Sequence, residues 1–113
     1  MYRGGGGGGG NMQQMLRQAQ KMQQKMEEDL ARVQEELEQR TVQASAGGGA
    51  VLAIASGAKK LLSIAIDPAA VDPLDIDMLQ DMVLIAVNEA LRLAEELSSS
   101  EMEKITGKMK LPF

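Results

Sequence analysis

The chain has 113 residues and a mass of 12.1 kDa, and 44% of its residues are hydrophobic, which is enough for one small folded domain. It contains no cysteine and no histidine, which excludes disulfides, thiol or imidazole catalysis and the usual zinc sites. It also contains no tryptophan, and Tyr2 and Phe113 are its only aromatic residues. A base-stacking platform for single strands is therefore not expected. Without a long apolar run or a signal peptide, we expect a cytoplasmic protein with no membrane partner.

The net charge of −4 conceals an uneven distribution of charge along the chain. Residues 1–26 hold four bases and no acid, whereas residues 27–113 hold the other eight bases and all sixteen acids. Segregation of this kind bears on the partners of a protein rather than on its fold. The positive excess falls in the first half of the strongest helical pattern of the chain.

Residues 1–10 end in seven consecutive glycines and are predicted to be a disordered leader, because glycine loses the most backbone entropy on ordering. Asn11 is a suitable N-cap for a helix over residues 11–40, which would be roughly 43 Å long. A compact domain of this size has a radius of gyration of about 13 Å, so the helix is predicted to project. Its apolar residues recur at spacings of three and four, at Met12, Met15, Ala19, Met22, Met26, Leu30, Val33 and Leu37.

A projecting helix with one apolar stripe needs a partner, and a homodimer is the simplest one. Methionine dominates the outer half of the stripe, and its flexible side chain favours either loose coiled-coil packing or repacking on a ligand. The second helical pattern is also apolar over a wider face than one sheet would cover. The residues that we expect at the dimer interface or in packing are Met22, Met26, Leu30, Val33, Leu84, Ile85 and Leu91.

Residues 41–66 alternate with period two, which predicts a sheet of three antiparallel strands. The predicted strands and connections are Thr41–Ala46, a turn at Gly47–Gly49, Ala50–Ser56, a two-residue connection at Gly57–Ala58, and Lys59–Ile66.

Residues 72–107 are predicted to be helical, starting at Asp72-Pro73, with a break at Ser98–Ser100 and a short final helix that ends at Gly107. Residues 108–113 form a tail. The prediction is therefore an α+β protein with a single domain over residues 11–107: a long N-terminal helix, a three-stranded antiparallel sheet, a second helix and a short C-terminal helix.

Two other motifs have structural explanations. Gly47-Gly48-Gly49 lacks the Lys-Ser/Thr of a phosphate-binding loop and precedes a strand, so it is predicted to be a hairpin turn. The aspartates at positions 72, 75, 77 and 81 lack the pattern of a calcium loop and favour the start of a helix. With no catalytic constellation either, we expect no enzyme activity, no metal, no cofactor and no small-molecule substrate.

The remaining candidate site is on the first helix, where Arg17, Lys21 and Lys25 recur every four residues and so share one face. Glutamines surround them, and a basic stripe set among glutamines is compatible with phosphate contacts from a helix that lies on duplex DNA. The residues by themselves leave three possibilities open: DNA binding, binding of a partner protein, and a solvated helix face.

Several segments, in this order, resemble the YbaB/EbfC family of bacterial nucleoid-associated proteins. They are KMQQKMEE at residues 21–28, VQASAGGGAV at 42–51, IDPAAVDP at 66–73, LQDMVLIAVNEA at 79–90 and MEKITG at 102–107. The resemblance implies a homodimer with an α/β core and helices that protrude like tweezers. It also implies non-enzymatic binding to double-stranded DNA in the nucleoid, with effects on nucleoid organisation and gene expression.

On this hypothesis Arg17, Lys21 and Lys25 contact phosphate, and Arg92, Lys104 and Lys108 are weaker candidates. Sequence specificity is expected to be low, because no constellation of base-reading side chains is evident. The alternative is a structural or protein-interaction dimer that grips a partner helix through its methionine-rich arm.

Overall fold

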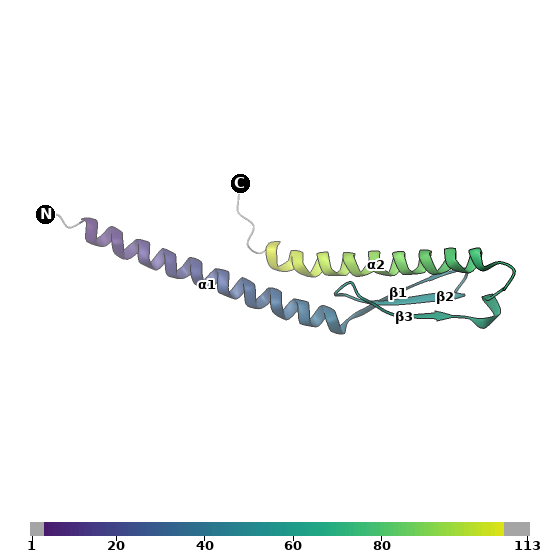
Figure 1. The fold of residues 1–113 in the computed structure, drawn as a ribbon. Helices are drawn as coiled ribbons and strands as arrows, with labels where there is room; N and C mark the ends of the chain where they lie inside the picture. Colours follow the sequence, from purple (N-terminus) through teal and green to yellow (C-terminus); the bar gives the residue numbers. More distant parts are fainter. Residues whose placement is uncertain (1–3, 108–113) are drawn as a thin grey trace.

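The computed structural model describes residues 4–107 of the chain (Figure 1). It consists of two long helices and one three-stranded antiparallel sheet with the strand order β1-β2-β3, which confirms the predicted α+β class. The elements are α1 (Gly4–Gln39), β1 (Thr41–Ala46), β2 (Val51–Ser56), β3 (Leu61–Ile66), the 3-10 helix η1 (Pro68–Ala70) and α2 (Ile76–Thr106).

The molecule is a rod of 92 × 27 × 16 Å with a radius of gyration of 24.2 Å. A compact domain of this length would have a radius of gyration of only about 13 Å. The excess length comes from α1, whose N-terminal half extends well beyond the end of α2 (Figure 1). The predicted projection of the first helix is therefore confirmed.

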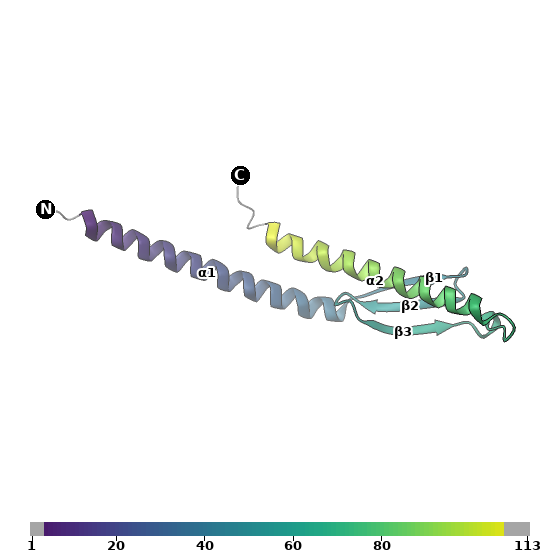
Figure 2. The same ribbon diagram turned by 45° about the horizontal axis from the view of Figure 1, so that its top comes forward.

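The main core lies between α2 and the sheet, and it is built largely from alanine (Figure 2). Val51, Ala53 and Ala55 alternate along β2 and are completely buried against α2. Small side chains on both surfaces let the helix approach the sheet closely, so a larger residue there would have no space. The alanines that α2 contributes to this core are Ala86, Ala90 and Ala94.

A second, smaller core fixes the base of α1 against the last turns of α2. Leu37 is fully buried, and Val33 and Ile105 are each 8% exposed. The backbone N–H of Gly57 donates to the carbonyl oxygen of Arg40 at 2.9 Å, which ties the hairpin after β2 to the end of α1. The exposed outer half of α1, residues 11–25, is called the arm from here on.

The predicted disordered leader and the N-cap at Asn11 are wrong for residues 4–10, since α1 begins at Gly4. Each glycine costs about 1 kcal/mol relative to alanine in a helix, but extending an existing helix requires no new nucleus. The long helix that follows is the nucleus from which these turns extend. Residues 1–3 and the predicted tail at 108–113 lie outside the described part of the chain.

The predicted start of the second helix is also wrong, because α2 begins three residues after Pro73. Asp75 is the N-cap, and its Oδ1 accepts a hydrogen bond from the N–H of Met78 at 3.2 Å. Asp72 instead accepts from the N–H of Leu74 at 2.9 Å and so closes a turn before the helix. Both residues have cap-like side-chain bonds, and only the tertiary packing selects which of them starts the helix.

The separate short C-terminal helix does not form, because α2 continues through Ser98–Ser100 to Thr106. Ser98 is only 8% exposed, and the residues beyond it, Met102 and Ile105, pack against the base of α1. This packing outweighs the modest helix propensity of three serines. The expected end at Gly107 is confirmed, since Gly107 is the C-cap.

The two hairpin connections differ in how well the sequence predicted them. Gly47, Gly48 and Gly49 have φ values of 66°, 68° and 97°, which confirms the predicted turn. The second connection has four residues, Gly57–Lys60, rather than two, and the N–H of Ser56 donates to the carbonyl oxygen of Lys60 at 2.8 Å. The register then shifts by one residue opposite Ile54/Ala55, which is a β-bulge.

Candidate nucleic-acid interface

The arm carries the three bases predicted to contact DNA, and every residue of the arm is exposed. We call Arg17, Lys21 and Lys25 the cationic stripe. Successive members are four residues apart, so they lie about 6 Å apart along one face of the helix. Within residues 4–107 none of the three forms an ion pair, and the arm contains no acid. The stripe is therefore available to an external anion.

The weaker candidates on α2, Arg92 and Lys104, form ion pairs with nearby carboxylates. Arg92 donates to Glu89 and to Glu96, with N···O distances of 2.6 Å for both ion pairs. Hydrogen bonds and charge attraction from these two carboxylates raise the pKa of Arg92, and the hydrogen bond from Arg92 lowers the pKa of Glu89. A phosphate would have to displace two carboxylates to bind this guanidinium.

Lys104 is also neutralised locally. Its Nζ lies 3.2 Å from Oε1 of Glu101, and the same oxygen accepts from Arg40 at 2.9 Å. Hydrogen bonds from Lys104 and then Arg40 lower the pKa of the Glu101 carboxyl. Lys108, the last of the predicted DNA-binding residues, lies outside the described residues. The structure thus separates the three arm bases from the predicted bases on α2.

A second face of the arm is apolar and is called the methionine face; its members are Met12, Met15, Leu16, Ala19 and Met22. Met12, Met15 and Met22 are 67%, 68% and 53% exposed. A helix turns about 100° per residue, so Ala19 lies about 160° around the helix from Lys21. The arm therefore presents a cationic side and an apolar side that substitutions can test separately.

The apolar stripe of α1, which runs from Met12 to Leu37, has two different environments. Met26, Leu30 and Val33, predicted at the interface or in packing, contact the chain's own α2 at the arm's base. Met22 remains exposed at the edge of this contact. The inner half of the stripe is thus satisfied within one chain, and the outer half is not.

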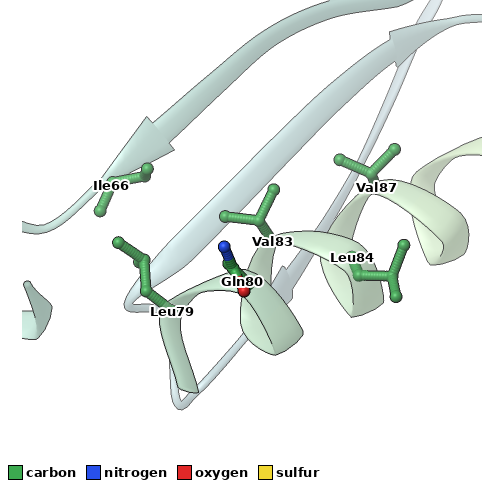
Figure 3. Close-up of a pocket in the computed structure, with 6 residues that line it drawn as sticks. All are labelled: Ile66, Leu79, Gln80, Val83, Leu84 and Val87. Carbon is green, nitrogen blue, oxygen red and sulfur yellow. The ribbon is translucent and has the colours of Figure 1, made fainter. Parts of the chain in front are cut away.

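A second apolar surface is a groove of about 430 Å³ between β3 and the first half of α2 (Figure 3). Leu84, predicted at the dimer interface, lines it and is 59% exposed. Two other residues predicted at the interface or in packing do not line the groove. Leu91 packs against the alanine-rich core, and Ile85 is 58% exposed outside the groove. The groove is lined by Ile66, Leu79, Gln80, Val83, Leu84 and Val87.

The residues expected at the interface included none from β3, which contributes to this surface. All six residues of β3 are exposed, including Leu62 at 54%, Ile64 at 40% and Ile66 at 39%. The signal in the sequence was the apolar character of both sides of this strand, since a strand that faces water on one side normally alternates with polar residues. An exposed apolar edge strand leaves backbone groups and apolar side chains open to contact with another chain.

The aspartates between β3 and α2 have local structural roles. Asp67 accepts a hydrogen bond from the N–H of Ala69 at 2.9 Å, and Asp72 and Asp75 accept from the amides described above. Asp67 thus caps η1, and Asp75 caps α2 as the role predicted for the acidic segment requires, whereas Asp72 closes the turn before α2. Across residues 4–107, neither helix has a stretch that is both apolar enough and long enough to span a bilayer.

A small α+β domain with an exposed, cationic helical arm defines a class of proteins that bind nucleic acid through phosphate charge. Residues 8–109 match the YbaB/EbfC DNA-binding family, and the chain belongs to this family. The resemblance seen in the sequence is thereby confirmed. The family is described by DNA binding rather than by a reaction.

Two similar proteins and one solved structure extend this result. A nucleoid-associated protein of Moorella thermoacetica is 59% identical over 83 residues, which cover 74% of this chain and 80% of the relative. A nucleoid-associated protein of Pelotomaculum thermopropionicum is 54% identical over 87 residues, with 77% and 83% coverage. The crystal structure of an uncharacterized protein from Helicobacter pylori matches with a TM-score of 0.68 at 19% identity, covers 82% of this chain and 94% of that one, and shows the shared fold.

Proposed function

We propose that the protein is a homodimer that binds double-stranded DNA through the cationic stripes of its two arms. The observation that carries this proposal is the contrast between the arm bases, which have no carboxylate partner among residues 4–107, and Arg92 and Lys104, which do. Unpaired bases gain the most from phosphate, because no internal ion pair has to be broken first.

The exposed groove supports the dimer. A monomer in water would leave the apolar side chains of β3 and Leu84 uncovered, and burial of such surface stabilises by about 25 cal/mol per Å². A second copy supplies the same apolar surface, so a two-fold symmetric contact covers both grooves at once. Pairing also presents two cationic stripes to one ligand, which strengthens binding beyond that of a single arm.

We further propose low sequence specificity and a location in the nucleoid of the cytoplasm. Lysine and arginine in a helical stripe contact phosphate, whereas base recognition needs side chains placed for specific groove edges. The relatives are named as nucleoid-associated proteins, which supports the same location for this chain. Binding at many sites would change DNA conformation and thereby nucleoid organisation and gene expression.

The test combines a duplex-DNA gel shift at low salt with light scattering for subunit number. Replacing Arg17, Lys21 and Lys25 together by glutamate should abolish the shift while the scattering mass stays that of a dimer. The control is Arg92→Gln, which removes a base that is already paired and should retain the shift. A triple variant that binds as well as the parent, or a parent that scatters as a monomer, would contradict the proposal.

The alternative function, a dimer that grips a partner helix, uses the methionine face instead of the stripe. Its specific support is the exposure of Met15 and Met22 on the arm. Met15→Ala with Met22→Ala leaves every base in place, so DNA binding should persist if the cationic stripe is the site. If the purified parent protein is not retained on duplex DNA at low salt, the partner-helix function is favoured.

A further inference from the structure

The helix face that carries the cationic stripe continues beyond the arm, where its charge changes sign. A helix turns about 100° per residue, so Glu28, seven residues after Lys21, lies within about 20° of Lys21 around the helix. Glu28 is also three residues beyond Lys25, which is about 4.5 Å along the helix axis. The first acid on this face therefore follows directly after the last base of the stripe.

The charge of Glu28 is not cancelled by the part of the chain that the structure describes. Its side chain is exposed, and it forms no ion pair with any residue of the range 4–107. Lys25, although three residues away on the same helix, is likewise unpaired within this range. Glu28 therefore presents a full negative charge to any ligand of the stripe.

The same face carries no free base from Glu28 to the end of α1. Arg32 is the only base between Lys25 and Gln39, and its guanidinium is held by the carboxylate of Asp29 at 2.9 Å. Glu35 lies about 40° around the helix from Lys21 and is exposed, with no ion pair inside residues 4–107. The face thus consists of three free bases followed by two free acids.

A duplex that lay along this face would meet opposite forces on the two sides of Lys25. DNA carries one negative charge per about 1.7 Å of its axis, so phosphates would stand close to this face along its whole length. The Debye length is about 10 Å at 0.1 M salt, so a phosphate near Lys25 is within reach of the charge of Glu28. Phosphate is therefore attracted on the arm side of Lys25 and repelled on the side of the sheet.

We propose that Glu28 ends the DNA-contacting surface of α1 and thereby holds the duplex at the arm. This role rests on the proposed function, because it requires that the cationic stripe contacts phosphate. Glu28 is a positioning residue that makes no bond to DNA, and its charge opposes movement of the duplex from the arm toward the sheet. Glu35 acts in the same direction farther along the face.

Glu27 provides a matched control for Glu28. It is adjacent in the sequence, exposed and without an ion pair in the described range, but it lies about 120° around the helix from Lys21. Glu28→Gln should tighten duplex binding about threefold at 50 mM salt, because one acid near phosphate is removed from each arm. Glu27→Gln makes the same change in net charge and should alter the affinity by less than about twofold.

Charge reversal gives a second readout, which net charge alone would not move. Glu28→Lys adds one base to the end of each stripe, so about eight phosphate contacts per dimer should replace about six. The slope of log affinity against log salt should then steepen from about −5.4 to about −7.2. Glu27→Lys should keep the slope of the parent, and all four variants can be compared by fluorescence anisotropy of one labelled duplex.

The outcomes separate the role of Glu28 from DNA binding itself. Equal effects at positions 27 and 28, or no effect at position 28, would refute the role of Glu28. The proposed function would still stand in that case, provided that the parent binds the duplex and the triple glutamate variant of the stripe does not. A parent protein that does not bind duplex DNA at low salt would overturn both.

Discussion

Replacing Lys21 with glutamine tests the cationic stripe most sharply. Lys21 is the middle base of the stripe, and it is exposed on a helix that already carries glutamine at position 20. Glutamine and lysine have nearly the same helix propensity, so the arm should keep its conformation and the stability of the protein should not change. In the proposed homodimer the substitution removes one base from each of the two arms.

The expected magnitude comes from counterion release. Three bases on each arm give about six phosphate contacts per dimer, and the slope of log affinity against log salt is then about −5.4. A rise from 50 to 200 mM salt should weaken binding by the parent about 10³-fold. With about four contacts left, Lys21→Gln should have a slope near −3.6 and lose only about 10²-fold over the same range.

The assay is fluorescence anisotropy of a labelled duplex, titrated with protein at a series of salt concentrations. The matched control is Arg92→Gln, which removes a base held by Glu89 and Glu96 and should leave the slope within the scatter of the parent. The reasoning is refuted if Lys21→Gln leaves the slope unchanged, or if Arg92→Gln lowers it equally. A second duplex of unrelated sequence should give the same slopes, since phosphate contacts carry no base information.

Three further predictions concern stability and assembly. Leu37→Ala removes a fully buried side chain from the base of the arm and should lower the free energy of unfolding by about 2–5 kcal/mol, measured by urea denaturation. Leu84→Glu places a charge in the groove beside β3 and should shift the light-scattering mass from dimer to monomer. Glu101→Gln should lower the melting temperature at pH 7. This difference should shrink as the pH falls below about 4.5, because Lys104 and Arg40 hold the pKa of Glu101 below that usual value.

For each of these three variants, a specific result would refute the prediction. Leu37→Ala with the stability of the parent would mean that the arm's base does not hold α1 to α2. A dimeric Leu84→Glu would place the interface elsewhere. For Glu101, the sign is set by the lowered pKa: its ion pairs stabilise the fold at pH values above the usual pKa and are lost when the carboxylate is protonated. A difference that grows on acidification would therefore contradict the assigned pairing.

The element types and the geometry of the cationic stripe were accessible from local patterns. The spacing of apolar residues along α1 and the alternation along β1 and β2 are periodic, and each periodicity reports one exposed and one buried side of an element. The positions of Arg17, Lys21 and Lys25 on one face follow from the same helical geometry. The pairing of Arg92 and Lys104 follows from local spacing too, because their carboxylate partners lie three or four residues away on α2. The contact of Arg40 with Glu101 depends on the fold.

The end points of the helices required the tertiary structure. Asp72 and Asp75 are equally suitable caps by local chemistry, and three serines in a row favour a helix end. α2 nevertheless starts at Ile76 and continues through Ser98, because its two ends bury side chains against the sheet and the base of α1. Packing of this kind joins residues distant in the sequence, so no local pattern contains it.

The amino-acid sequence by itself determined the α+β class, the projecting cationic helix and the family resemblance, because these follow from periodicity, charge order and short motifs. Only the tertiary structure paired Arg40 with Glu101 and divided the apolar stripe of α1 into a buried inner half and an exposed outer half. The physical reason is that α2 ends partway along α1: contacts along the shared length bury apolar surface, and the arm beyond that length stays exposed.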